Sequence, residues 1–159
     1  MPGGLRRHLP RTAAAVLATA VAGSVGTDVS SRWYDTLRKP VWQPPGWAFG
    51  PAWTTLYALI AVSSARVLDR ADEQQARSYR RALGANLALN TAWSWLFFTA
   101  KRPRWALAEV LLLEASTLDL ARRAHAVDPA AHHLLAPYAA WVGFASALNA
   151  EIVRLNPDR

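Results

Sequence analysis

Cysteine is absent from the 159 residues of the chain. The protein therefore has no disulfide framework, no thiolate nucleophile and no metal site held through sulfur. Histidine is also scarce: the four histidines lie near the start of the chain or near the ends of apolar segments. None of them is placed to ligate a haem iron from the middle of such a segment. We expect no metal site, the adjacent pair His132 and His133 included.

Charged residues make up only 18% of the chain, against 52% hydrophobic residues, and the formal net charge is +7. In a soluble protein this basic excess would indicate a nucleic-acid partner. Here, however, the charges cluster in short runs at residues 6–11, 66–81, 101–104 and 122–128, separated by apolar stretches. Basic residues at the ends of apolar segments can meet lipid headgroups. We therefore expect a lipid bilayer as partner and no nucleic acid.

Five apolar runs are each close to the ~20 residues that cross ~30 Å of hydrocarbon as a helix. They are rich in alanine and leucine and lack the period-two alternation of strands. Helices also satisfy their own backbone hydrogen bonds, as lipid requires. We predict one domain over residues 1–159, an all-α membrane protein built as a five-transmembrane-helix bundle with its two ends on opposite sides. The predicted helices cover about residues 12–29, 51–68, 82–100, 105–121 and 130–155.

Charges and prolines set the limits of these helices. Residues 66–81 are expected to form a charged connector. Pro51 suits the first turn of the second helix, where its missing N–H is no loss. Asp128 followed by Pro129 predicts an N-cap and the first position of the fifth helix. Pro137 is expected to kink that helix. Basic residues are shared almost evenly between the two sides, so the positive-inside rule gives no orientation.

The first apolar run admits two interpretations. A basic start, an apolar run and small residues near position 22 are typical of a secretory signal peptide, which would be cleaved after about residues 1–22. Alternatively, the run is the first membrane helix, and Ala18, Ala22 and Gly26 recur every four residues so that a neighbouring helix can approach closely. We favour the membrane helix.

The connection between the first two predicted helices is rich in tryptophan and proline. The stretch from Trp33 to Tyr57 holds four of the eight tryptophans and four of the ten prolines. Each proline lacks an N–H donor and fixes its own φ, so the stretch is not one continuous helix. Its indoles suit either an aromatic belt at a membrane interface or a ligand pocket. A belt does not require so many prolines, so we favour a stiff lid over a binding site.

Three predicted helices each carry aromatic rings and an amide or hydroxyl on one face. By their spacing, the faces comprise Asn86, Asn90, Trp93 and Phe97; Trp53 and Tyr57; and Tyr138, Trp141, Ala145 and Asn149. Amides within a membrane point away from lipid, into the bundle or a cavity. We expect the three faces to surround a shared site, although polar packing between helices would produce the same pattern.

Small residues form another face of the third predicted helix. Gly84, Ala88 and Ala92 lie nearly opposite its polar face and allow close helix packing. Two uses remain open for them, a homodimer contact and packing within the chain, and we favour the homodimer.

The predicted fourth helix carries two carboxylates. Glu109 and Glu114 are five positions apart and so do not share a face. They fit a proton site or protonated packing groups, and we assign them no role. No nucleophile–base constellation is present, since Ser94 has no histidine near it in the sequence.

One ordered series of residues resembles the signature of the TspO/MBR family, the tryptophan-rich sensory proteins of bacteria and the translocator proteins of mitochondria. The series is Trp33-Tyr34, Leu37, Lys39-Pro40 and Trp42-x-Pro44-Pro45-x-Trp47-x-Phe49-x-Pro51-x-Trp53-Thr54-x-Leu56-Tyr57. Further matches are Leu87-x-Leu89-Asn90-x-x-Trp93-Ser94, Phe97-Phe98, Trp105-Ala106-Leu107 and Pro137-Tyr138-x-x-Trp141-x-x-Phe144-Ala145-x-x-Leu148-Asn149. The resemblance covers about residues 13–156.

The resemblance implies five transmembrane helices, commonly dimeric, and a pocket closed by the first loop. It implies porphyrins and related tetrapyrroles as ligands, and a bacterial cell-envelope membrane as the location. In eukaryotic members cholesterol also binds, but Ala150 stands where their sterol motif has tyrosine, which argues against cholesterol here. Carried over to this chain, the pocket residues are Trp33, Tyr34, Trp42, Trp53, Tyr57, Asn90, Trp93, Tyr138, Trp141 and Ala145, to which the helix face adds Asn86 and Phe97.

A porphyrin is a flat, apolar macrocycle that carries carboxylates. Its faces would stack on indoles such as Trp53 and Trp141, and Arg38 or Lys39 would pair with its carboxylates. No cofactor is required, and we expect a receptor or regulator. The alternatives are a transporter of porphyrins or lipidic molecules, and a light-dependent porphyrin-degrading protein with Trp53 and Trp141 as electron partners. Binding comes first in all three.

Overall fold

The structure, a computed structural model, describes residues 4–158. Within that range all regular elements are helices, which confirms the predicted all-α class. The elements are α1 (Gly4–Gly26), α2 (Arg32–Asp35), α3 (Gly46–Arg70), α4 (Glu73–Ser94), the π-helix η1 (Trp95–Thr99), α5 (Pro103–Val127) and α6 (Pro129–Leu155). Residues 1–3 of the alternative signal segment, and residue 159 of the predicted domain, lie outside the described range.

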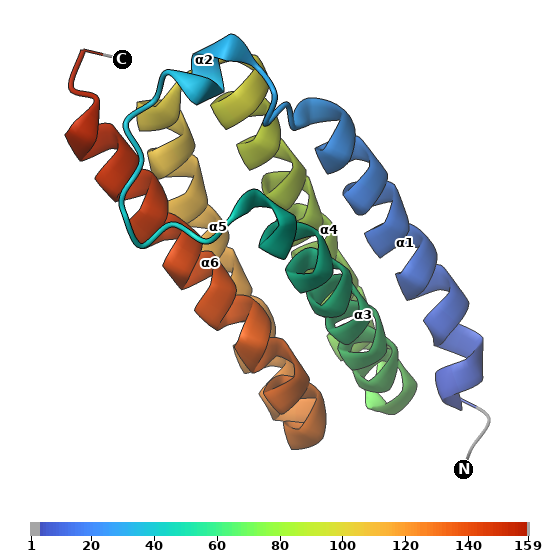
Figure 1. Ribbon diagram of the computed structural model, residues 1–159. Coiled ribbons are helices and arrows are strands. Elements are labelled where there is room, and N and C mark those ends of the chain that lie inside the picture. The colour runs from blue at the N-terminus through green and yellow to red at the C-terminus, as the bar shows by residue number, and fades with distance from the viewer. Residues whose placement is uncertain (1–3, 159) are drawn as a thin grey trace.

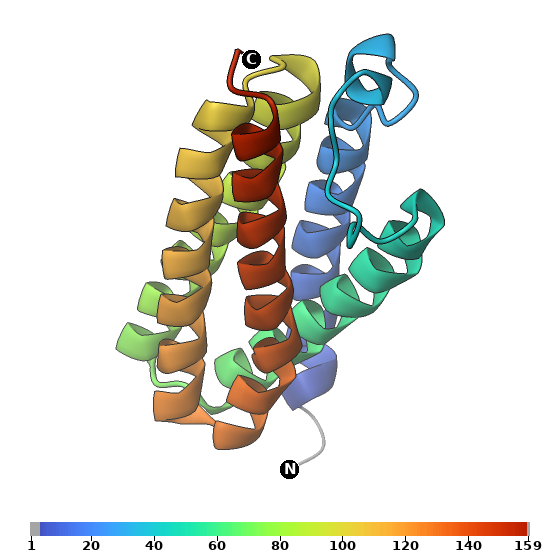
Figure 2. The same ribbon diagram turned by 60° about the vertical axis from the view of Figure 1, so that its left-hand side comes forward.

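The five long helices pack as a closed ring in the order α1, α3, α6, α5, α4. Consecutive helices are neighbours in this ring except that α1 is inserted between α3 and α4. Figures 1 and 2 show the described chain starting at one end of the bundle and finishing at the other, where α2 also lies. From α2 the connection to α3 descends along the bundle beside α6 (Figure 1). The start of α3 therefore lies lower along the bundle than α2 (Figure 1).

Helix α1 begins eight residues before the predicted position 12, and its buried face differs from the expected one. The buried face comprises Thr12, Val16, Thr19, Gly23 and Gly26. Ala18 is exposed, so the predicted small-residue stripe is wrong at that position. The close approach does occur farther along: a Cβ on Gly26 would lie 2.7 Å from Trp95 Nε1, and Trp95 Nε1 donates to the Ala22 carbonyl at 3.0 Å.

The charged connector predicted over residues 66–81 is wrong. Helix α3 continues to Arg70 and α4 begins at Glu73, so only two residues separate them. Asp72 caps α4 by accepting from the Gln75 N–H at 2.8 Å. The charges in this segment occupy the outer face of helices whose inner face remains apolar, which a count of charges does not reveal.

Helix α3 begins at Gly46, five residues before the predicted position. Pro45 is its N-cap, with an extended backbone (φ −62°, ψ 146°). Pro51 is therefore inside the helix and not in its first turn, and it leaves the carbonyl of Trp47 without its usual intrahelical partner. The prediction failed because the Pro44-Pro45 pair, and not Pro51, ends the extended segment.

Helix α4 continues directly into the π-helix η1. The Ala100 N–H donates to the Trp95 carbonyl at 2.7 Å, five residues back. The wider turn brings two successive rings against Trp93, with centroid distances of 5.2 Å to Phe97 and 6.0 Å to Phe98. Short π-helical turns occur frequently at functional sites.

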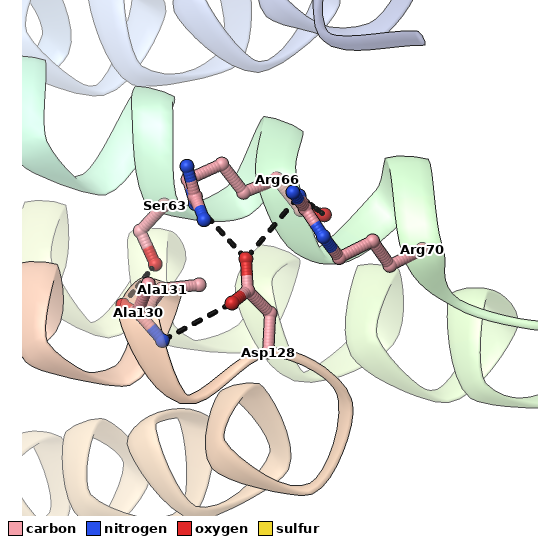
Figure 3. A network of polar contacts seen from close by, with 6 residues as sticks. All are labelled: Ser63, Arg66, Arg70, Asp128, Ala130 and Ala131. Carbon is pink, nitrogen blue, oxygen red and sulfur yellow. Dashed lines mark hydrogen bonds and ion pairs between the residues drawn. The ribbon is translucent and has the colours of Figure 1, made fainter. Parts of the chain in front are cut away.

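The turn between α5 and α6 is tied to the end of α3 through Asp128. The predicted N-cap is confirmed, because Asp128 Oδ1 accepts from the Ala130 N–H at 3.1 Å. Its Oδ2 lies 2.9 Å from Arg66 Nε and 3.3 Å from Arg70 Nη1 (Figure 3). Burial alone would raise the pKa of Asp128, but the hydrogen bonds from Arg66 and Ala130 and the two guanidinium charges outweigh it and lower that pKa. The carboxylate is therefore ionised at neutral pH.

One helical segment in the described part of the chain, Arg7–Gly26, is long and apolar enough to cross a membrane by length and hydropathy alone. It lies near the N-terminus, where a signal sequence passes the same test. The predicted number of five spans is therefore not established by this criterion. Large apolar side chains nevertheless lie exposed on the outside of α1 and α5, namely Leu17, Val21, Val25, Leu111, Leu112 and Leu118.

Candidate functional site

A cavity of about 730 Å³ lies inside the helix ring, beneath the connection between α1 and α3. Ligand pockets typically have volumes of ~300–1,000 Å³. All five long helices and η1 contribute to its lining, and so does the connection, which we call the lid (residues 27–45). The aromatic lining residues are Tyr34, Phe49, Trp53, Tyr57, Trp93, Phe97, Phe98, Trp141 and Phe144.

Three tryptophans from three helices meet at this cavity: Trp53 of α3, Trp93 of α4 and Trp141 of α6. The rings of Trp53 and Trp141 are in edge contact, with centroids 6.3 Å apart and planes at 82°. Trp93 instead stacks on Phe97 of η1, at 5.2 Å and 22°. Flat apolar surfaces thus border the cavity from α3 and α6 and from α4 and η1. This convergence is what the spacing of the residues predicted.

A chain of hydrogen bonds, which we call the amide chain, connects the helices below these rings. Tyr57 Oη donates to Asn90 Oδ1 at 3.0 Å, and Asn90 Nδ2 donates to Tyr138 Oη at 3.1 Å. Tyr138 Oη donates to Asn86 Oδ1 at 3.0 Å, and Asn86 Nδ2 donates to Thr117 Oγ1 at 3.0 Å. Both amides therefore have protein partners. They position the cavity wall and are not left free for a ligand.

The lid is anchored to the end of α6 by one side chain. Asn156 Oδ1 accepts from the Arg38 N–H at 3.0 Å, and Asn156 Nδ2 donates to the Arg38 carbonyl at 2.9 Å. A single buried amide thus satisfies both backbone groups of one lid residue, 118 positions away in the sequence. Asn156 carried no sequence signal, because nothing local distinguishes it from an ordinary helix-ending asparagine.

Two lid tryptophans pack against lining rings and do not themselves line the cavity. Trp33 contacts Phe97 with centroids 5.7 Å apart, and Trp42 contacts Phe144 at 5.8 Å. Both contacts are edge-on, at 73° and 69° respectively. They hold the lid against η1 and α6.

The lid contributes polar groups to the cavity, in addition to those of the helices. Lys39 Nζ donates to the Tyr34 carbonyl at 2.5 Å and lies 4.3 Å from the centre of the Tyr34 ring. Gln43 Nε2 donates to Tyr34 Oη at 3.1 Å, while Gln43 Oε1 is buried without a hydrogen-bond partner in the described structure. Burial raises the pKa of Tyr34 above its usual value, more than the Gln43 hydrogen bond lowers it. Arg38 is exposed and does not line the cavity, so of the two predicted cations only Lys39 belongs to the lining.

The predicted ligand-binding residues divide into two groups. Those that line the cavity are Tyr34, Trp53, Tyr57, Asn90, Trp93, Phe97, Trp141 and Ala145. Trp33, Trp42, Asn86 and Tyr138 lie behind the lining: the first two contact its rings, and the last two belong to the amide chain. The sequence did not predict the lining contributed by Gly23 and Ser24 of α1 or by Phe49 of α3. The apolar lining residues Val110 and Leu113 of α5 were not predicted either.

The small-residue face of α4 is only partly used within the chain. Gly84 and Ala88 are exposed and Ala92 is half-buried. A Cβ on Gly84 would meet no atom within 4 Å. Packing inside the described chain therefore does not explain this face at Gly84.

The two carboxylates of α5 do not line the cavity. Both carboxyl oxygens of Glu109, and Oε2 of Glu114, are buried without a hydrogen-bond partner in the described residues. Glu114 Oε1 lies 3.6 Å from the position that a Cβ on Gly143 would take, at the α5–α6 contact. Over residues 4–158 no cluster of three or more His, Cys, Asp or Glu side chains could hold a metal ion.

Four other tryptophans are exposed, namely Trp42, Trp47, Trp95 and Trp105. They belong to the lid, the start of α3, η1 and the start of α5, all toward the lid end of the bundle. The tryptophans thus occupy two environments. The aromatic-belt and lid-and-pocket interpretations of the sequence describe different members of the same set.

Comparison with known protein families identifies the family to which the chain belongs. The sequence model of the TspO/MBR family matches residues 12–155, which include every residue that lines the cavity. The chain belongs to the TspO/MBR family. The resemblance drawn from the lid and the three helix faces is thereby confirmed.

Individual relatives come from bacteria and mammals. The chain is 38% identical over 143 residues to protein CrtK of Rhodobacter capsulatus, covering 89% of each chain. It is 39% identical over 127 residues to a tryptophan-rich sensory protein of Cereibacter sphaeroides, covering 80% of this chain and 78% of the relative. It is 38% identical over 120 residues to the translocator protein of Homo sapiens, covering 74% and 71%.

Proposed function

We propose that this TspO/MBR protein is an integral membrane protein whose five long helices cross the bilayer, in the cell envelope of a bacterium. Each long helix has 22 to 27 residues, which is enough to span ~30 Å of hydrocarbon. Exposed leucines and valines on α1 and α5 support this placement, because soluble monomers rarely expose large apolar patches. The exposed tryptophans toward the lid end suit a membrane–water interface.

Within that membrane, we propose that the cavity binds a porphyrin or a related tetrapyrrole. The observation that carries the proposal is the meeting of Trp53, Trp93 and Trp141 at one cavity of about 730 Å³. A flat macrocycle can contact rings from two sides, and aromatic contacts add ~0.5–1.5 kcal/mol beyond area burial. Lys39 is placed for a carboxylate of the ligand and Gln43 Oε1 for a donor. The described lining contains no histidine, so stacking and charge would hold the ligand without axial ligation.

The test compares two tryptophans of different placement. Trp141→Phe is expected to weaken protoporphyrin binding about three- to tenfold, because it removes part of a stacking surface. Trp105→Phe makes the same change at an exposed position outside the cavity lining and should leave binding unchanged. Binding is followed through the porphyrin absorbance of purified protein in detergent, so the readout does not depend on tryptophan emission. Equal affinities of the two variants would reject this cavity as the site.

Receptor function, transport and light-dependent breakdown share this binding step and differ in the fate of the bound porphyrin. Flux of porphyrin into proteoliposomes would identify a transporter. Formation of a defined product in light, faster than with free tryptophan, would identify a porphyrin-degrading protein. Binding without either outcome supports the receptor or regulator that we propose.

We also propose that two copies associate through the exposed small-residue face of α4, Gly84, Ala88 and Ala92. The exposure of Gly84 and Ala88 supports this, since close helix contacts in membranes use such residues. Ala88→Leu is expected to shift the protein from dimer to monomer in light-scattering measurements on detergent complexes. Ala115→Leu, at another exposed helical alanine, is the control and should not. A dimer that persists in Ala88→Leu would assign the contact to a different face.

A further inference from the structure

A second cavity, of about 700 Å³, lies between α4 and α5 at the end of the bundle opposite the lid. It is a groove on the outer surface, since Arg81 and Ala85 in its lining are exposed. Its lining divides into two parts along α4. Arg77 and Arg81, with Arg123 of α5, form a charged part, and Ala82, Ala85 and Leu89 form an apolar part that leads toward the middle of the bundle.

The three arginines of the groove are held to different degrees. Arg123 is fixed from both sides, with Nε 2.6 Å from Asp119 Oδ2 and Nη1 2.5 Å from Ser78 Oγ. Arg77 contacts only the exposed carboxylate of Glu73, at 3.3 Å. No hydrogen bond or ion pair engages Arg81 within the described residues.

Asp119 is the one carboxylate in the lining, and it is already engaged by Arg122 and Arg123. With Glu73 beside Arg77 and Asp119 beside Arg123, the three guanidinium groups meet two carboxylates, and the excess positive charge is that of Arg81. Guanidinium groups recognise phosphate through two parallel N–H···O bonds, with more specificity than an ammonium group. The groove therefore has a positively charged end that continues along Ala82, Ala85 and Leu89 of α4, with Ser116 of α5 as a further lining residue.

We propose that this groove binds an anionic phospholipid, with the phosphate at Arg77 and Arg81 and one acyl chain along Ala82, Ala85 and Leu89. Basic pockets between transmembrane helices are suited to anionic lipid headgroups. A free phosphate would use the arginines alone and leave the apolar part of the groove without an occupant. The proposal rests on the membrane placement proposed above, and it is independent of tetrapyrrole binding.

The test titrates the full-length protein in detergent with phosphatidylglycerol and counts retained lipids by native mass spectrometry. Arg81→Gln is expected to weaken lipid retention about fivefold, because each arginine attracts an anionic headgroup. The double variant with Arg77→Gln and Arg81→Gln is expected to weaken it about 25-fold. Arg80→Gln is the matched control, because it removes the same charge from an exposed neighbour outside the lining. It should retain lipid like the unchanged protein.

Further variants and ligands distinguish between the possible occupants of the groove. Ala85→Trp fills the apolar part of the groove and should weaken phosphatidylglycerol retention. Retention of phosphatidylcholine equal to that of phosphatidylglycerol, or equal losses in Arg80→Gln and Arg81→Gln, would overturn the proposal. Thermal protection by inorganic phosphate as strong as that by phosphatidylglycerol would assign the groove to free anions and also overturn it. A change of oligomeric state in Arg81→Gln without loss of lipid would show that the groove is a contact between two copies of the protein. That result would also overturn the proposal.

Porphyrin binding is measured in the same samples. Arg81→Gln should bind porphyrin like the unchanged protein, because the groove and the aromatic cavity lie at opposite ends of the bundle. Selective phosphatidylglycerol retention in protein that binds no porphyrin would support the groove and reject the tetrapyrrole proposal alone.

Discussion

Replacing Asp128 by alanine is expected to lower the free energy of unfolding by about 2–3 kcal/mol. The substitution removes an N-cap, worth ~1 kcal/mol, and the partner of two arginines. Breaking a fully buried ion pair costs ~3–5 kcal/mol, but this value must be discounted here. The Asp128 side chain is 8% exposed, whereas those of Arg66 and Arg70 are 29% and 45% exposed and partly screened by solvent. The measurement is reversible unfolding in mixed micelles.

Asp128→Asn removes the charge but keeps a side chain that can cap the helix. Asparagine still caps a helix, so this variant should lose less stability than Asp128→Ala. Glu73→Gln is the control, because it breaks the exposed pair with Arg77 and should change stability by under ~0.5 kcal/mol. The neighbouring contact from Ser63 Oγ to the Ala131 carbonyl, 2.8 Å long, remains in all variants (Figure 3). Equal stabilities of Asp128→Ala and Glu73→Gln would show that the cluster is not stabilising.

The same carboxylate predicts a dependence on pH. Because the pKa of Asp128 is lowered on folding, its contribution is complete above the ordinary value of 3.8. The contribution is then lost as the pH falls through the lower pKa of the folded state. Asp128→Asn should therefore lose less stability than the unchanged protein between neutral pH and pH values below that pKa. Parallel stability curves for the two proteins over this range would contradict the assignment.

Tyr138→Phe is expected to destabilise the protein by about 2 kcal/mol, because it removes the centre of the amide chain. Asn90 Nδ2 loses its acceptor and Asn86 Oδ1 loses its donor. A buried polar group without a partner costs ~1–3 kcal/mol, although measured hydrogen bonds between membrane helices average only ~0.6 kcal/mol. Thermal and denaturant unfolding in detergent provide the measurement.

Two further variants distinguish hydrogen bonding from packing. Tyr57→Phe removes one hydrogen bond from a half-buried hydroxyl at the cavity and should cost less than Tyr138→Phe. Adding Asn86→Leu to Tyr138→Phe removes an orphaned amide oxygen and should recover part of the loss. A Tyr138→Phe protein as stable as the unchanged one would show that the amide chain contributes specificity alone.

Local periodicity in the sequence predicted part of the lining that α3, α4 and α6 contribute to the cavity. Trp53 and Tyr57, or Asn90 and Trp93, lie one turn apart on a helix wherever that helix packs. The non-helical character of the lid was also predictable, because its prolines restrict the backbone through their own chemistry. These properties belong to a single segment and need no knowledge of its neighbours.

Pairings between segments were not visible in the sequence. The sequence assigned Tyr138 and Asn86 to a ligand, but the structure pairs them with each other across 52 positions. The small residues of α1 occur on more than one face, so spacing could not exclude Ala18 from the packing stripe. Likewise, nothing local marks the π-helical turn at Trp95, which depends on the rings that it places against Trp93.

The double hydrogen bond between Asn156 and the backbone of Arg38 acts as a fixed pivot within the lid. It divides the lid into two halves, which Lys39 and Gln43 of the second half link by hydrogen bonds to Tyr34 of the first. The half before the pivot carries the short helix α2 and the Trp33 contact with Phe97. The half after it is held by the edge contact of Trp42 with Phe144 and by the hydrogen bond from Gln43 Nε2 to Tyr34 Oη. A ligand would reach the interior once the second half loses its contacts with Phe144 and Tyr34, while Trp33 keeps the first half against Phe97 of η1.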